Sequence, residues 1–212
     1  MQILIFGDSI VYGSWDTEKG GWVNRLREYL EDKMLAYPSL YYLTYNLGIS
    51  GDTSTELLSR FKSETEARLK EEGEKLFIFA IGTNDATFVP SQNDFKSRGI
   101  DNFKTNLSEL LKQAQQFPAK IVFVGFVPID ESKTTPFEWN PDRVLTTENL
   151  NKYQGALKSF CAENNIPFID VYENFIKEDY KNLLDDGLHP NSSGHQKIFE
   201  IVRDYLTANK FI

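Results

Sequence analysis

The chain has 212 residues, of which 41% are hydrophobic and 25% charged, and its formal net charge is −8. This length suits one domain with a large core, and the composition excludes wholesale disorder. The negative charge, with no cluster of Lys and Arg to offset it, argues against a nucleic-acid backbone or an anionic membrane surface as a partner.

Five short apolar runs alternate with longer amphipathic segments. They predict strands at residues 3–6, 42–45, 76–81, 121–124 and 167–171. Runs that are apolar on both faces are typical of a parallel sheet covered by helices on both sides. The intervening patterns predict helices at residues 21–33, from Thr53 onward, at 103–116, at 150–163, and around Ile198 to Leu206. We therefore expect a single domain over residues 1–212, with an α/β/α sandwich of three layers.

Two of the helices carry clear local signals. Thr53 is followed three residues later by Glu56, which is the pattern of a capping box. The last helix places Ile198, Ile201 and Val202 on one face. The longest irregular segment is residues 128–147, and a loop of that length in a compact domain is often functional.

The termini and the cysteine content give further expectations. The first residues read MQILIFGDS, which lacks the basic and long apolar regions of a signal peptide, and no apolar run is long enough to cross a membrane. The sequence therefore predicts a cytoplasmic protein. The single Cys161 excludes an internal disulfide and a zinc site made of several thiolates, and we expect it in the core.

Chemistry-bearing residues follow the predicted strands. In open α/β sheets ligands bind beyond the carboxyl ends of the strands, so the residues just after each strand are the informative ones. Four blocks occupy such places: Gly7-Asp8-Ser9, Gly48-Ile49-Ser50-Gly51-Asp52, Gly82-Thr83-Asn84-Asp85 and Asp186-Gly187-Leu188-His189-Pro190. Together they supply a hydroxyl, a glycine backbone, a carboxamide and an Asp/His pair, which are the parts needed for acyl transfer.

These four blocks, in this order from Gly7 to His189, resemble the SGNH (GDSL-type) hydrolases over the whole chain. The one visible departure is Ile10, where the family has Leu, and that swap conserves volume. The resemblance implies a flavodoxin-like sandwich with a five-stranded parallel sheet in the order 2-1-3-4-5. It also implies a serine hydrolase that needs no cofactor or metal.

The resemblance gives each block a role. Ser9 would be the nucleophile and His189 its general base, because a free serine hydroxyl is weakly nucleophilic without one. Asp186 would orient His189 through the Nδ1–H of the imidazole. The oxyanion hole would consist of the backbone N–H groups of Ser9 and Gly51 and the side-chain amide of Asn84.

Competing interpretations exist for several of these residues. A Gly-Asp-Ser stretch, Gly51 or Asn84 can simply form a turn or a cap. Asp185 could replace Asp186 on spacing alone. The second histidine, His195, lies on the predicted last helix beside its apolar face, which indicates a structural residue.

Asp8 and Asp85 are interpreted as scaffolding that binds backbone at strand ends, although with Asp186 and His189 they would be the residues of a metal site. No metal-binding spacing supports that site. No phosphate-binding glycine motif or G-x-S-x-G elbow occurs either, and the S-x-x-K match at Ser59 lacks its companion motifs.

The substrate side is less determined. Phe88, Val89, Phe137 and Trp139 fall in loops at the same end as the four blocks, where they could line an acyl pocket or anchor the loops. The predicted partner is a small-molecule ester with a small or medium acyl group; the oligomeric state is not predicted. A carbohydrate deacetylase, an acyl-thioesterase and a binding module with a dead site are the alternatives.

Overall fold

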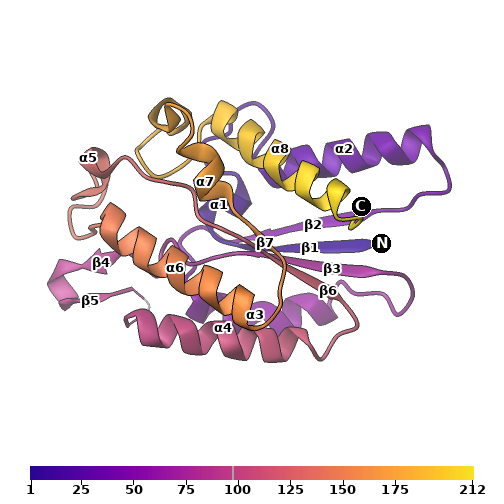
Figure 1. The fold of residues 1–212 in the computed structure, drawn as a ribbon, viewed down its shortest axis with the longest axis horizontal. Helices are drawn as coiled ribbons and strands as arrows, with labels where there is room; N and C mark the ends of the chain where they lie inside the picture. The colour runs from indigo at the N-terminus through magenta and orange to yellow at the C-terminus, as the bar shows by residue number, and fades with distance from the viewer. Residues whose placement is uncertain (97) are drawn as a thin grey trace.

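A parallel sheet of five strands lies between two layers of helices in the computed structural model, which describes residues 1–96 and 98–212 (Figure 1). The order of the strands is β2-β1-β3-β6-β7, and all four pairings are parallel. The strands are β1 (Gln2–Gly7), β2 (Leu43–Gly48), β3 (Lys75–Ala80), β6 (Lys120–Val124) and β7 (Phe168–Ile169). Both the fold and the 2-1-3-4-5 order that the resemblance implied are therefore confirmed.

The two helical layers bury opposite faces of β1. Ile3 and Ile5 face α2 (Trp22–Ala36) and α8 (Ser192–Ala208) in one core cluster. Leu4 and Phe6 point to the other face, which is covered by α3 (Ser54–Glu66), α4 (Ile100–Ala114) and α6 (Thr147–Glu163). Alternation of side chains along a strand is what separates the two clusters. The four aliphatic and aromatic residues are fully buried, as expected for a central strand.

The predicted capping box at the start of α3 is present. The Thr53 side chain accepts a hydrogen bond from a backbone N–H of the first turn, and the Glu56 carboxylate accepts one from the Thr53 N–H at 2.8 Å. These contacts satisfy backbone donors that the helix leaves unpaired, so α3 begins at a fixed point directly after the second strand-end block.

Some predicted boundaries are wrong. The second strand runs three residues beyond residue 45, and β7 has only two residues because Asp170 accepts from the Glu173 N–H and so starts α7 (Val171–Phe175). The segment at residues 128–147 contains a short helix, α5 (Glu131–Thr134). A small hairpin was not predicted; it comprises β4 (Phe88–Val89), η1 (Pro90–Gln92) and β5 (Asp94–Phe95).

The hairpin and α5 lie beyond the carboxyl ends of the central strands (Figure 1). The hairpin is joined to the segment that follows α5, because Phe88 and Val144 exchange two backbone hydrogen bonds. A last short helix, η2 (Tyr180–Leu183), precedes the turn that leads into α8. Over the described residues, no helix has both the length and the apolar character needed to cross a bilayer.

Candidate active site

Ser9 is the first residue of α1 (Ser9–Tyr12), a single helical turn that directly follows β1. The Asp8 carboxylate caps this turn by accepting from the Ile10 N–H at 2.9 Å. The turn rests on the end of β2, where a Cβ on Gly48 would lie 2.2 Å from the Tyr12 backbone nitrogen. Gly48 is therefore needed for close approach, and the hydroxyl of Ser9 is held at the carboxyl edge of the sheet.

The hydroxyl of Ser9 meets the imidazole of His189 although 180 residues separate them in the chain. The Ser9 Oγ lies 2.9 Å from the His189 Nε2, and the His189 Nδ1 lies 2.7 Å from the Asp186 Oδ2. The other oxygen of Asp186 accepts from the backbone N–H groups of Leu188 and His189 at 3.0 and 2.8 Å. This chain of contacts is the geometry that lets an imidazole take a proton from a serine while a carboxylate orients it.

The structure thus brings Asp186, and not Asp185, to the imidazole. Asp185 is exposed, and its backbone N–H donates to the His189 carbonyl at 2.9 Å. Burial alone would raise the pKa of Asp186, but the hydrogen bond and charge of His189 and two backbone N–H groups lower it to about 2. Asp186 is therefore ionised at any pH near neutrality.

The second and third strand-end blocks lie beside Ser9, because Gly7 is in register with both Gly48 and Ala80. Gly51 has a φ of 86°, which favours glycine, and the Asn84 side-chain amide donates to the Asp52 carbonyl at 3.1 Å. Since Asp52 follows Gly51, this bond ties the two blocks together. Among the described residues this is the contact that the Asn84 amide makes, and its second amide hydrogen can donate to a ligand.

Two basic residues that were not predicted as part of the site support these blocks. Arg60 donates to the Asp52 carboxylate at 2.7 Å and to the Gly7 carbonyl at 3.0 Å, so it joins the second block to the end of β1. Lys96 donates from its Nζ to the Gly51 carbonyl at 2.7 Å. Burial, together with the charge of Arg143, lowers the pKa of Lys96. No local sequence pattern marks either contact, because each joins residues at least eight positions apart.

Asp85 is scaffolding, as interpreted from the sequence. Its carboxylate accepts from the Ser54 backbone N–H at 2.9 Å and from the Ser54 hydroxyl at 2.5 Å, and it is fully buried. It thereby anchors the start of α3 to the third block. Both of its oxygens accept from Ser54 at the start of α3, so Asp85 holds the third block and α3 in a fixed relation.

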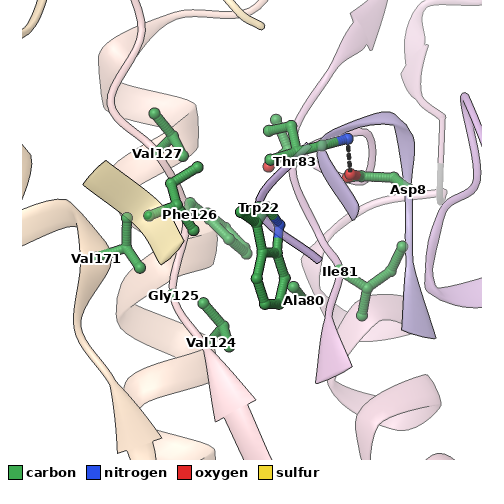
Figure 2. A pocket seen from close by; sticks show the side chains of 12 residues that line it. Asp8, Trp22, Ala80, Ile81, Thr83, Val124, Gly125, Phe126, Val127 and Val171 are labelled. Carbon is green, nitrogen blue, oxygen red and sulfur yellow. Dashed lines mark hydrogen bonds between the residues drawn. The ribbon is translucent and has the colours of Figure 1, made fainter. Parts of the chain in front are cut away.

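Asp8 also borders a pocket whose other walls are mainly apolar, including Trp22, Ile81 and Phe126 (Figure 2). Burial raises the pKa of Asp8 to about 6, although the Ile10 N–H and the charge of His189 oppose the shift. The folded protein therefore holds a proton on Asp8 between pH 3.8 and about 6 that the unfolded chain releases. Stability contributed by this group is lost as the pH rises through that window.

We expect Asp8→Asn to stabilise the protein at pH 8, because Asn keeps an oxygen for the Ile10 N–H and carries no buried charge. The gain should be about 2 kcal/mol in the free energy of unfolding, and it should shrink as the pH falls from 6 to 4. Urea unfolding of both proteins across that range measures it. A difference that stays constant with pH would contradict this assignment.

The four residues expected to line a substrate pocket are placed differently. Phe137 is 1% exposed and Val89 is 7% exposed, and both pack in the core, so neither presents an open wall. Phe88 is half-buried against the Phe95 ring. Trp139 is exposed, with its ring against Phe137 and below the Arg143 guanidinium. A loop sequence cannot show which of its apolar residues turn inward, and that explains the difference.

The second histidine, His195, is fully buried on α8. Its Nε2 lies 2.9 Å from the Ser14 carbonyl, and its Nδ1 accepts from the Trp22 N–H at 3.3 Å. These partners assign the proton to Nε2, and burial lowers the pKa of His195. It is a structural residue, as the sequence indicated, and Cys161 is likewise buried.

Comparison with known proteins places these features in context. The family model described as "GDSL-like Lipase/Acylhydrolase family" matches residues 5–197. No curated protein matches the sequence. Among solved structures, an acetylxylan esterase from Geobacillus stearothermophilus is 22% identical with a TM-score of 0.71, covering 97% of this chain and 92% of that one.

A lipase/acylhydrolase from Enterococcus faecalis is 21% identical with a TM-score of 0.73, and the match covers 98% of this chain and 96% of that chain. A member of the lipolytic protein G-D-S-L family from Veillonella parvula is 19% identical with a TM-score of 0.70, and the match covers 98% of each chain. At these identities the structures share the fold across nearly the full length of the chain.

Proposed function

Because the chain belongs to the GDSL-like lipase/acylhydrolase family, and is therefore an esterase-type hydrolase, we propose that it cleaves small or medium acyl esters through an acyl-enzyme on Ser9. The observation that carries the proposal is the continuous chain from the Ser9 Oγ to the His189 Nε2 at 2.9 Å and from Nδ1 to Asp186 at 2.7 Å. Residues from opposite ends of the sequence meet there with the contacts that nucleophilic catalysis needs.

In the first half-reaction the Ser9 Oγ attacks the ester carbonyl while its proton passes to the His189 Nε2. The negative charge that develops on the carbonyl oxygen is bound by the N–H groups of Ser9 and Gly51 and by the Asn84 amide. When the tetrahedral intermediate collapses, His189 returns the proton to the leaving alcohol. Asp186 holds the imidazole in the required tautomer and stabilises the imidazolium that forms.

In the second half-reaction a water molecule attacks the acyl-enzyme and gives its proton to His189. The same three donors bind the second oxyanion, and the Ser9 oxygen leaves with the proton from His189. The carboxylic acid is released and the site returns to its starting state. Every proton transfer in this sequence uses a group of this chain and water.

A fluorophosphonate probe tests the proposal directly, because it reacts with an activated serine and leaves a covalent adduct. We expect one adduct, located at Ser9 by mass spectrometry, which is lost in Ser9→Ala and forms much more slowly in His189→Ala. Folded protein that forms no adduct would overturn the enzyme proposal and favour a binding module. An adduct on another serine would assign the role of nucleophile to that residue.

Deacetylation of acetylated sugars is the second candidate. Tyr12 and Trp15 are exposed near Ser9, and such aromatic faces are suited to binding the apolar face of a sugar ring. The acetylxylan esterase among the similar structures is consistent with it, although the likeness is one of fold. Rates on p-nitrophenyl esters of increasing chain length, on acyl thioesters and on acetylated xylo-oligosaccharides would rank these substrate classes.

Asn84→Ala should lower kcat by about 10²–10³-fold, because it removes one of three proposed donors to the developing oxyanion. KM should change little, since that donor binds the transition state more strongly than the ground state. The matched control is Asn164→Ala, which alters an exposed Asn at the end of α6 and should leave kcat unchanged. If kcat of Asn84→Ala falls by less than tenfold, the Asn84 amide is not a donor of the oxyanion hole.

A further inference from the structure

Trp15 makes a contact with the Asp–His pair that neither the sequence nor the family match assigned. Its indole Nε1–H donates to the Asp186 Oδ2 at 3.1 Å, and that oxygen is also the partner of the His189 Nδ1. The indole and imidazole rings meet edge to face, with centroids 6.1 Å apart at 76°. Trp15 itself is 51% exposed, so it lies on the solvent side of this pair.

The backbone of Trp15 is unusual for its residue type. Its φ is 69°, in the left-handed region that bulky residues rarely adopt. A conformation of this kind costs free energy and persists only when the surrounding structure imposes it.

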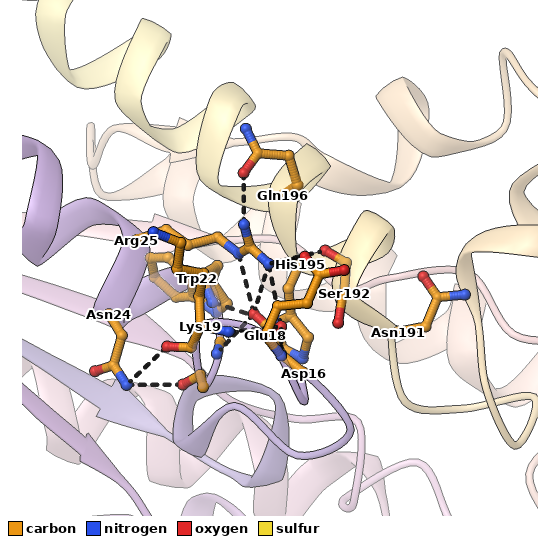
Figure 3. Close-up of polar contacts among 12 residues, drawn as sticks. Asp16, Glu18, Lys19, Trp22, Asn24, Arg25, Asn191, Ser192, His195 and Gln196 are labelled. Atoms are coloured by element: carbon orange, nitrogen blue, oxygen red, sulfur yellow. Dashed lines mark hydrogen bonds and ion pairs between the residues drawn. The ribbon is translucent and has the colours of Figure 1, made fainter.

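Both neighbours of Trp15 are held by buried polar side chains. Ser14 precedes it, and the Ser14 carbonyl accepts from the buried His195 at 2.9 Å. Asp16 follows it, and the Asp16 carboxylate accepts from Arg25 at 3.0 and 3.1 Å and from the Gly21 N–H at 2.9 Å (Figure 3). Burial would raise the pKa of Asp16, but the hydrogen bonds of Arg25 and of backbone N–H groups lower it well below its usual range.

Arg25 joins this loop to the helix that follows His189. Its guanidinium donates to the Gln196 Oε1 at 2.8 Å and to the Ser192 carbonyl at 3.3 Å, both in the first turns of α8 (Figure 3). His195 belongs to the same turns. The N-terminal part of α8 therefore fixes the loop that carries Trp15, and α8 begins three residues after His189.

We propose that Trp15 is a positioning residue for the triad: its indole N–H fixes the rotation of the Asp186 carboxylate, and its ring covers the Asp186–His189 bond from solvent. This inference rests on the proposed function of Ser9 and His189. The bond from His195 to the Ser14 carbonyl and the buried Asp16–Arg25 pair hold the indole in place. A carboxylate held by four donors has one orientation toward the imidazole, and that preorganisation favours catalysis.

Trp15→Phe tests the proposal, because it keeps an aromatic ring and removes the donor. We expect kcat to fall about tenfold with little change in KM, since a hydrogen bond to a charged group is lost. Without the N–H, the Asp186 charge attracts the imidazolium proton more strongly. The acid limb of the kcat/KM profile should therefore move to higher pH, by about half a unit.

Among the described residues, the charge of His189 acts on Asp186 of its own turn, on Asp8 at the end of β1, and on His195 of α8. Of these, Trp15 donates a hydrogen bond to Asp186, so Trp15→Phe changes the field at the imidazole through that carboxylate. A control on the same loop is Glu18→Gln, whose side chain is 71% exposed and 3.6 Å from Arg25. That variant should keep both kcat and the acid limb of the unmodified protein.

A second measurement is independent of turnover. The hydrogen-bonded Nδ1–H of His189 should give a far-downfield proton resonance, which Trp15→Phe should shift or broaden and Glu18→Gln should leave in place. Suppose that the wild-type protein labels at Ser9 but that Trp15→Phe leaves kcat, the acid limb and the resonance unchanged. That result would overturn the role of Trp15 and leave the proposed function intact. A loss of activity with an unmoved limb and resonance would also overturn that role, because Trp15 would then be merely structural. Failure of Ser9 labelling would instead overturn the proposed function.

Discussion

His189→Ala should lower kcat by about 10⁵–10⁶-fold on any ester that the protein hydrolyses, which is the scale seen when the base of a serine hydrolase is removed. The imidazole Nε2 is the group placed 2.9 Å from the Ser9 Oγ, so its loss leaves the hydroxyl without a proton acceptor. Steady-state kinetics at pH 8 would measure the effect.

The fold should survive this change. The side chain of His189 is 12% exposed and makes its contacts with Ser9, Asp186 and Trp15 at the surface of the site. The thermal midpoint is the control, and it should stay within a few degrees of the wild-type value. A variant that keeps more than about one hundredth of the activity would show that another group accepts the serine proton.

Asp186→Asn should lower kcat by about 10⁴-fold. An Asn side chain can still accept from the Leu188 and His189 N–H groups, so the turn keeps its shape. It can also present its amide to the Nδ1, which favours the imidazole tautomer that has its proton on Nε2 and cannot act as a base. The lower rate would therefore result from the wrong tautomer of His189 and not from a change in its position.

Asp185→Asn is the matched control, because it makes the same chemical change one residue earlier on an exposed side chain. It should leave kcat within about twofold of the wild type, as surface changes usually do. A larger loss of kcat in Asp185→Asn than in Asp186→Asn would assign the orienting carboxylate to Asp185. Because the pKa of Asp186 is lowered to about 2, activity lost between pH 7 and 4 should not arise from its protonation.

The architecture was predictable because each central strand carries its own signal. The apolar run before Gly7 and the run before Gly82 mark strands that are buried on both faces, and a parallel sheet then brings their ends to one edge. For the same reason the blocks at those ends could be proposed as the site, and the family resemblance then implied a role for each residue. The capping box at Thr53 shows that local hydrogen-bonding chemistry is also readable from the sequence.

What could not be predicted depends on contacts between distant residues. Strands β4 and β5 have two residues each, too few for any periodic pattern, and they form by pairing with each other and with Val144. Phe137 packs in a core cluster, most of whose other members are distant in sequence. The residues next to it in the sequence therefore do not show that it is buried. The Trp15 contact joins positions 171 residues apart, so only the folded chain shows it.

The wide separation of Ser9 and His189 has a consequence for biosynthesis. The proposed base, His189, is translated 180 residues after the proposed nucleophile, Ser9. A nascent or truncated chain that stops before Asp186 lacks the proposed base and its carboxylate, so we expect it to be hydrolytically inert, whatever part of the sheet it has assembled.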